Sequence, residues 1–401
     1  MIKEDSMNQK SPIHVEVFGA SQIEHGAMEQ IYDAAKLPVS LAAALMPDAH
    51  QGYGLPIGGV LATDNAVIPY GVGVDIGCRV ALSIYEMPHH ELFKNPQFFR
   101  KLLLDNTLFG AGRGFKGKDK SDHPVLENNL FKELPLLRKL KDRAWSQLGT
   151  SGGGNHFAEF GVFTLTDTDP RLNLEKGEYL ALLTHSGSRG LGANIANHFT
   201  KVAKSKSQLD RRITNLSYLS LDSEDGQTYW NSMELAGDYA SACHQIIHEK
   251  IHQTLGSQLL AKVENHHNFA WKEIWKGQEV IVHRKGATPA SEGTLGFIPG
   301  SMVDPGFLVR GKGIESGLNS AAHGAGRQMS RRQAFKNYNK KDLNHIASKH
   351  EISLIGAGID EIPMAYKNIH QVMRAQEELI EVLGQFDPKV VRMADDGSRE
   401  D

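Results

Sequence analysis

The chain has little cysteine and little net charge: two cysteines, Cys78 and Cys243, among 401 residues, and a formal charge of −3. Two cysteines cannot form a disulfide framework, which indicates a reducing compartment. No apolar run approaches the roughly 20 residues that span a bilayer, and the N-terminal MIKEDSMNQK lacks the apolar core of a signal peptide. We therefore expect a cytoplasmic protein with no membrane partner.

The composition excludes several classes of protein. Hydrophobic residues make up 40% of the chain and charged residues 23%, so a disordered, collagen-like or coiled-coil chain is excluded. The small net charge argues against coating nucleic acid by bulk charge, but it leaves a local basic groove open. The length allows two or three domains of about 150 residues. Because there is no repeat and no long Ser/Pro linker, a single domain over 1–401 is the simpler prediction.

Short β-rich segments alternate irregularly with helical stretches. The predicted strands are 13–17, 78–87, 156–163, 178–185 and 279–284. The predicted helices are 128–148, 190–206, 229–256 and 366–384. Since regular βαβ repetition is absent, the fold class is expected to be α+β.

The 40 glycines cluster where predicted strands end. They fall in GYGLPIGG (52–59), GVGVDIGC (71–78), GTSGGGNHF (149–157), HSGSRGLG (185–192), PGSM (299–302) and HGAGR (323–327). Glycine lets the backbone approach a ligand closely or adopt positive φ. Six such loops indicate one large site assembled from many segments.

Potential metal ligands lie in these loops. Asp75 and Cys78 in VDIGC could face one metal ion, although a buried cysteine is more often a small hydrophobic residue. Histidines with glycine, serine or asparagine neighbours add further donors: His156, His185, the pair His266 and His267, and His323. This set exceeds the four ligands of a structural zinc site, so two metals bridged by one ligand are plausible. The carboxylate favours Mn²⁺ or Mg²⁺, whereas thiolate and imidazole also suit Zn²⁺, Co²⁺ or Ni²⁺.

Two other patterns are set aside. His244, His248 and His252 form an i, i+4, i+8 stripe on the predicted helix 229–256, which we expect to be solvated or at a rim. The segment GRGFKGKD (112–119) matches a phosphate-binding Walker A loop up to its lysine, but it has Asp119 where Ser or Thr must hold Mg²⁺. We expect it to be a mobile basic loop.

Cationic residues that suit phosphate also occur. Arg189 follows a Ser-Gly-Ser turn, Arg310 and Lys312 lie in LVRGKG, and six cations with no acid lie between 327 and 341. Arg327 and Arg331 would lie one turn apart on a helix that His323 opens. The Lys-x-Asp-Gly signature of lysine-dependent nucleotidyl transferases is absent, so His323 is a candidate covalent nucleotide carrier.

The ordered motifs resemble those of the RtcB family of GTP-dependent RNA-splicing ligases. The motifs are MPDAHQGYGLPIGG, GVGVDIGC, GGGNHFAEF, HSGSRG, HHN, RKGA, PGSM, HGAGRQMSR and DEIPMAYK, and the resemblance runs from about residue 46 to 383. It implies a single α+β domain around two Mn²⁺ ions. Residues 384–401 depart from the family pattern, because the C-terminal lysine that reads guanine is missing. Lys389 or Arg392 could substitute, or the nucleotide preference could be altered.

The resemblance also implies roles for individual residues. Cys78 would bridge the two ions, completed by Asp75, His156, His185 and His267. His323 would attack the α-phosphate of GTP. The residues that match nucleotide or phosphate contacts are Asn155, Glu159, Ser301, Tyr366, Arg189 and Arg327. Asp48 is a candidate for the later strand-joining step.

The implied reaction joins an RNA 3′-phosphate, formed from a 2′,3′-cyclic phosphate, to a 5′-hydroxyl end through a histidine-linked GMP and an RNA-linked GMP. It would serve RNA repair or tRNA splicing, with the protein as a monomer. The need for an archease-like activating partner is left open. One alternative is a two-metal cyclic phosphodiesterase or phosphohydrolase that needs no His323. Another is a non-catalytic protein that binds RNA ends.

Overall fold

The computed structural model describes residues 13–395 and has an α+β fold, as the sequence predicts. One sheet has five strands in the order β1-β2-β3-β11-β10, and the other follows the order β13-β14-β17-β6-β7-β5-β9, with β16 paired to β17. The first sheet comprises β1 (Val15–Val17), β2 (Ser40–His50), β3 (Ile57–Thr63), β10 (Phe269–Trp275) and β11 (Gln278–Lys285). The second comprises β5 (Arg79–Tyr85), β6 (Phe157–Leu165), β7 (Gly177–Ser186), β9 (Leu259–His266), β13 (Leu295–Ile298), β14 (Gly306–Gly311), β16 (Ser353–Ile355) and β17 (Ile380–Met393).

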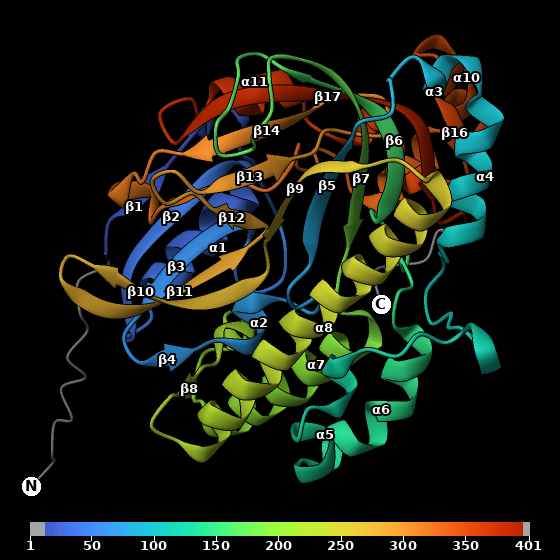
Figure 1. The fold of residues 1–401 in the computed structure, drawn as a ribbon. Helices are drawn as coiled ribbons and strands as arrows, with labels where there is room; N and C mark the ends of the chain where they lie inside the picture. Colours follow the sequence, from blue (N-terminus) through green and yellow to red (C-terminus); the bar gives the residue numbers. More distant parts are fainter. Residues whose placement is uncertain (1–12, 396–401) are drawn as a thin grey trace, which may run out of the picture.

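Short strand pairs and helices complete the fold. The pairs are β4 (Ala66–Val67) with β8 (Leu219–Ser220), and β12 (Ala287–Pro289) with β15 (Ser320–Ala322). The helices are α1 (His25–Ala35), α2 (Pro69–Val72), α3 (Glu91–Lys94), α4 (Pro96–Asn106), α5 (Leu130–Glu133), α6 (Pro135–Gln147), α7 (Arg189–Lys206), α8 (Glu224–Leu255), α9 (Arg331–Asn337), α10 (Lys340–Lys349) and α11 (Ile369–Arg374). In Figure 1, α8 crosses diagonally in front of the eight-stranded sheet, with α7, α6 and α5 below it.

The register of the eight-stranded sheet gathers the predicted metal ligands at one edge. In the antiparallel ladders, Val80 of β5 and Phe157 of β6 both pair with His185 near the end of β7. Arg79 pairs with His266, the last residue of β9. Neighbouring strands lie about 4.8 Å apart. Residues just before β5 and β6, and at the ends of β7 and β9, therefore come together.

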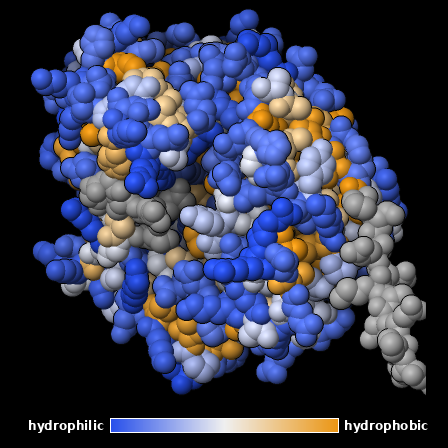
Figure 2. All heavy atoms as spheres, turned by 180° about the vertical axis from the view of Figure 1, so that it is seen from behind, coloured by the Kyte–Doolittle hydropathy of each residue, from blue (hydrophilic) through white to orange (hydrophobic). Residues whose placement is uncertain are grey.

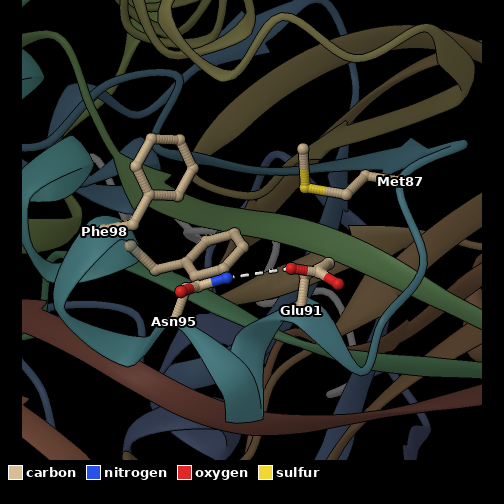
Figure 3. Close-up of a pocket in the computed structure, with 5 residues that line it drawn as sticks. Met87, Glu91, Asn95 and Phe98 are labelled. Atoms are coloured by element: carbon tan, nitrogen blue, oxygen red, sulfur yellow. Dashed lines mark hydrogen bonds between the residues drawn. The ribbon is translucent and has the colours of Figure 1, made fainter.

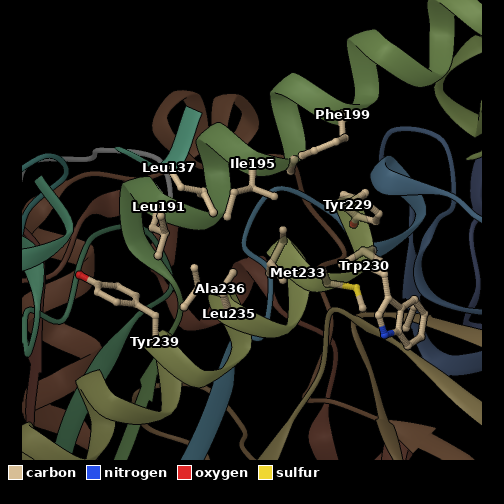
Figure 4. Packing of buried hydrophobic residues seen from close by; sticks show 14 of the residues in the cluster. Leu137, Leu191, Ile195, Phe199, Tyr229, Trp230, Met233, Leu235, Ala236 and Tyr239 are labelled. Atoms are coloured by element: carbon tan, nitrogen blue, oxygen red, sulfur yellow. The ribbon is translucent and has the colours of Figure 1, made fainter. Parts of the chain in front are cut away.

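Helix α8 is the longest element and carries much of the core beside this edge. The Ser223 hydroxyl caps its first turn by accepting a hydrogen bond from the Gly226 amide at 3.1 Å, and Gly256 closes it with φ 66°. Figure 4 shows Leu191 and Ile195 of α7 close to Met233 and Ala236 of α8. Burial of each large apolar side chain contributes about 1.5–3 kcal/mol.

The predicted solvated histidine stripe on α8 is wrong for two of its three members. His244 is fully buried and His248 is 5% exposed, and both face strands β5 and β7. Ser83, His248, Thr184 and His244 form a chain of hydrogen bonds of 2.8–2.9 Å. Because both ring nitrogens of His244 and of His248 have a polar partner, these two histidines lie in the core at little cost in free energy.

The predicted helix at 366–384 is also wrong. Only α11 is helical there, and β17 begins at Ile380 and runs to Met393 between β14 and β6. Residues 375–379 (AQEEL) form a turn after α11, and pairing on both sides makes the residues from Ile380 onward a strand despite any helical propensity. Residues 384–393 therefore lie inside the sheet.

The face of the molecule in Figure 2 is mostly hydrophilic, with hydrophobic side chains in small separate patches. Within residues 13–395, no helix is both long and apolar enough to cross a membrane. Both cysteines are buried, and neither forms a disulfide.

Candidate metal centre

Cys78 lies at the centre of two overlapping groups of metal donors. Its Sγ lies 3.2 Å from His185 Nε2 and 3.5 Å from His156 Nε2. One group of donor atoms is Cys78, His185 and His267, and the other is Asp75, Cys78 and His156; within each group the atoms lie within 4.8 Å of one another. The predicted ligands are thus brought together, and the only donor common to both groups is the thiol expected to bridge two ions.

The backbone around VDIGC holds these donors in place. The Gly77 amide donates to Asn268 O at 2.8 Å, and the His267 amide donates to Cys78 O at 2.8 Å. The turn that carries Asp75 and Cys78 is thereby tied to the end of β9. Gly187 follows β7, and a Cβ there would overlap the Asp75 carboxylate, so this position requires glycine.

The protonation states suit metal binding. Burial lowers the pKa of His185 to about 3 and holds the pKa of His267 well below its usual value, so both imidazoles are neutral. Burial alone would raise the pKa of Asp75, but the hydrogen bond with His156 and the nearby charge of Arg189 lower it further than burial raises it. Metal ions require ionised carboxylates and neutral imidazoles. The donor set therefore fits a resident pair of metal ions.

Arg189, predicted to contact phosphate, lies directly behind one of these groups. Its guanidinium is fully buried, with Nη2 3.0 Å from His156 Nδ1 and 3.9 Å from Asp75 Oδ2. A guanidinium can only donate, so His156 Nδ1 accepts this hydrogen bond, which fixes the orientation of the ring. In this arrangement Arg189 orients His156 and lowers the pKa of Asp75.

His323 stands beside the second group and is oriented by Asp48. Its ring centroid lies 4.9 Å from that of His267. Its Nδ1 lies 2.7 Å from Asp48 Oδ2, and its backbone amide donates to the same oxygen at 3.2 Å. A carboxylate that accepts the Nδ1 proton leaves the lone pair on Nε2. Asp48, predicted to act in strand joining, is thus placed against the candidate nucleophile.

His323 does not open a helix, contrary to the prediction. Residues 323–330 are irregular, and α9 begins only at Arg331 after a capping box formed by Ser330 and Gln333. Gly326 has φ 69°, and a Cβ there would overlap the Asp48 backbone. Close packing of this loop on β2 excludes a regular helix.

The remaining cations and nucleotide candidates are spread around this centre. Arg327 stacks on Tyr366, with the guanidinium carbon 5.2 Å from the ring centroid, and lies 3.4 Å from the Glu361 carboxylate. The Tyr366 hydroxyl donates to Glu361. Arg331 is paired with both Asp360 and Glu361. These two arginines are thus partly neutralised by acids that lie far from them in the sequence.

The other three nucleotide candidates differ in their surroundings. Glu159 of β6 is buried, and burial raises its pKa well above the usual range. The Asn155 carbonyl lies 3.1 Å from His185 Nδ1, while its side-chain Oδ1 is buried with no hydrogen-bond partner among the described residues. Ser301 donates to Asp304 in its own turn. Asn155 therefore both supports a ligand and offers a free acceptor.

Two buried lysines had no predicted role. Lys367 donates to Pro47 O at 3.1 Å and to Ala49 O at 2.6 Å, on both sides of Asp48. Lys285 donates to Tyr53 O at 2.5 Å and Tyr70 O at 3.3 Å, and burial lowers its pKa to about 7. Both lie in quoted motifs, RKGA and MAYK, but the sequence does not reveal that they are buried.

A cavity lies away from this centre, in the region of α3 and α4. It has a volume of about 280 Å³ and is lined by Met87, Glu91, Asn95, Phe98 and Phe99 of the α3–α4 region (Figure 3). It contains no histidine or cysteine, and its acid is engaged with Asn95 at 2.9 Å. This lining therefore offers no donor set like the one around Cys78.

The chain is similar to known RNA-splicing ligases over most of its length. A family profile described as "tRNA-splicing ligase RtcB" matches residues 30–133 and 110–394. RNA-splicing ligase RtcB of Escherichia coli (strain K12) is 34% identical over 395 residues, covering 90% of this chain and 92% of that protein. The tRNA-splicing ligase RtcB of Nanoarchaeum equitans is 29% identical, covering 97% and 96%. That of Thermococcus kodakarensis is 28% identical, covering 88% and 87%.

Proposed function

The chain belongs to the RtcB family of tRNA-splicing ligases, and on that basis we propose that it joins RNA ends in a GTP- and Mn²⁺-dependent reaction. The substrates are a 3′-phosphate or 2′,3′-cyclic phosphate end and a 5′-hydroxyl end. The observation that carries the proposal is the placement of His323, oriented by Asp48, against a set of donors that share Cys78.

His323 is the proposed nucleophile. With its Nδ1 proton held by Asp48, its Nε2 lone pair is available to attack the α-phosphate of GTP, with pyrophosphate as the leaving group. The RNA 3′-phosphate then takes GMP from His323. The 5′-hydroxyl of the second strand attacks the activated phosphate, and GMP leaves as the phosphodiester bond forms.

The remaining residues hold and orient the reactants. Bound Mn²⁺ ions would neutralise charge on the reacting phosphate oxygens. Cys78 would bridge the ions, with Asp75 and His156 on one side and His185 and His267 on the other. The proposed nucleotide contacts are Asn155, Glu159, Ser301, Arg327 and Tyr366, and Arg189 serves catalysis by orienting His156.

Guanine recognition is proposed to use Lys389 in place of the missing C-terminal lysine. Arg392, the other candidate, donates to Leu103 O at 2.6 Å and Thr107 O at 3.1 Å. Its guanidinium is therefore already engaged at the end of α4.

Because metal binding requires Cys78 to stay reduced, the proposal places the protein in the reducing cytoplasm. The active unit is proposed to be a monomer.

The experiment incubates the protein with an RNA that carries a 2′,3′-cyclic phosphate and a 5′-hydroxyl, with Mn²⁺ and either GTP or ATP. We expect circular RNA only with GTP, and none from His323→Ala. Opening of the cyclic phosphate without joining, equally in both proteins, would instead support the phosphodiesterase. Binding without any reaction would support the non-catalytic alternative.

A further inference from the structure

Tyr53 is an exposed aromatic residue on the loop that follows Asp48. The loop, residues 51–56, joins β2 to β3, and Tyr53 is 68% exposed. Its ring makes an edge contact with Tyr70, with ring centroids 6.5 Å apart and planes at 79°. An edge contact and this degree of exposure leave a ring face open to solvent.

The loop is fixed at several points. The Gln30 side chain donates to Gly52 O at 2.6 Å and accepts from Gly52 N at 3.0 Å. Lys285 Nζ binds the carbonyls of both Tyr53 and Tyr70 and lies 5.0 Å from the Tyr70 ring centroid. A ring presented on a fixed loop loses little entropy when a ligand stacks on it.

The loop also lies beside the candidate nucleophile. Gly286, next to the lysine that binds Tyr53, packs so closely on His323 that a Cβ there would lie 3.1 Å from His323 Cε1. The same position would overlap Ile57, the first residue after the loop. Tyr53 is therefore connected to the edge of the His323 site by Lys285, which binds the Tyr53 carbonyl, and by Gly286, which packs against His323.

We propose that Tyr53, supported by Tyr70, is a stacking subsite for a nucleobase near the RNA end that is joined. The subsite rests on the proposed function, because it places that end beside His323. A flat aromatic face accepts any base, since every base has a π surface. Another exposed aromatic residue, Phe93, lies on α3 and is 58% exposed.

The test measures binding of a fluorescent single-stranded RNA with a 3′-phosphate and a 5′-hydroxyl, by anisotropy, with Mn²⁺ and without GTP. Tyr53→Ala and Tyr53→Leu should raise Kd about 5- to 150-fold, while Tyr53→Trp should keep wild-type affinity. Phe93→Ala removes another exposed aromatic ring and should leave Kd unchanged.

A second probe lacks one base at its 3′ or 5′ end. Removal of the stacked base should weaken binding to the wild type but not to Tyr53→Ala. Equal Kd values for wild type, Tyr53→Ala and Tyr53→Leu, or an equal loss for the abasic probe in both proteins, would overturn the subsite. Failure of the wild type to join RNA ends would instead overturn the proposed function, whatever Tyr53 does.

Discussion

At the scale of single residues, the chemistry depends on where protons reside. The neutral imidazoles of His185 and His267 present lone pairs because burial lowers their pKa values. His323 is only partly buried and has a carboxylate at Nδ1. In the proposed reaction, histidine would thus serve as a metal ligand in one place and as the nucleophile in another.

Asp48→Asn should separate nucleophile orientation from metal binding. Asparagine nearly preserves the shape, but its amide can donate to Nδ1, which would leave the proton on Nε2 and block attack. We expect the rate of GMP uptake to fall at least about 100-fold, with metal content unchanged. The rate is measured with labelled GTP, and metal content by elemental analysis. A wild-type rate in Asp48→Asn would show that His323 needs no such partner.

Most site residues could be predicted from the sequence, because four of the five proposed ligands lie within two residues of a glycine at the end of a predicted strand. Asp75, Cys78, His156 and His185 are examples. The pairing of Arg331 with Asp360 could not be predicted, because nothing in the local sequence pattern brings these two segments together. The burial of Lys285 could not be predicted either, since a lysine is ordinarily exposed.

At the scale of elements, the ends of the strands determine where the proposed metal ligands lie. Strands β5, β6, β7 and β9 were either predicted or bounded by predicted motifs, and their antiparallel register brings the ligands together. The helices at 190–206 and 229–256 could be predicted because apolar residues recur at helical spacing over a long stretch in each of them. The helix predicted at 366–384 failed because β17 is stabilised by two neighbouring strands that the local sequence does not reveal.

Gly187→Ala should disturb the metal site from the end of β7. The added methyl would overlap the Asp75 carboxylate, so either the carboxylate or the backbone must move, at a cost of about 1–3 kcal/mol. We expect weaker Mn²⁺ binding by calorimetry and a lower unfolding free energy. Gly177→Ala, at the start of the same strand, meets nothing closer than 3.7 Å and is the control. Equal Mn²⁺ affinity in the two variants would contradict this packing argument.

At the scale of the whole molecule, buried neutral histidines couple folding to pH. Burial lowers the pKa of His244 to about 3 and of His283 to about 4. His283 Nε2 accepts a hydrogen bond from the Ile68 amide at 2.9 Å, which requires the neutral ring. In the unfolded chain both would titrate near the ordinary value of about 6.5.

Stability should therefore fall as the solution becomes acidic. Below about pH 6.5 the unfolded chain binds protons that the folded chain cannot, down to the folded pKa values. Each such histidine contributes a loss of about 1.4 kcal/mol per pH unit across that window. Urea unfolding between about pH 7 and pH 4.5 measures the slope, and His283→Asn should reduce it by one histidine's share. A pH-independent unfolding free energy would contradict the assignment.

The central claim is that one thiolate, Cys78, is shared by two metal ions, and counting bound Mn²⁺ tests it most directly. Wild type and Cys243→Ala, which loses the other buried thiol, should each bind two ions per chain. His156→Ala and His267→Ala should each lose one ion, because each ligand belongs to one group only. Cys78→Ala should lose both. Retention of two ions, or of one, by Cys78→Ala would contradict the shared thiolate.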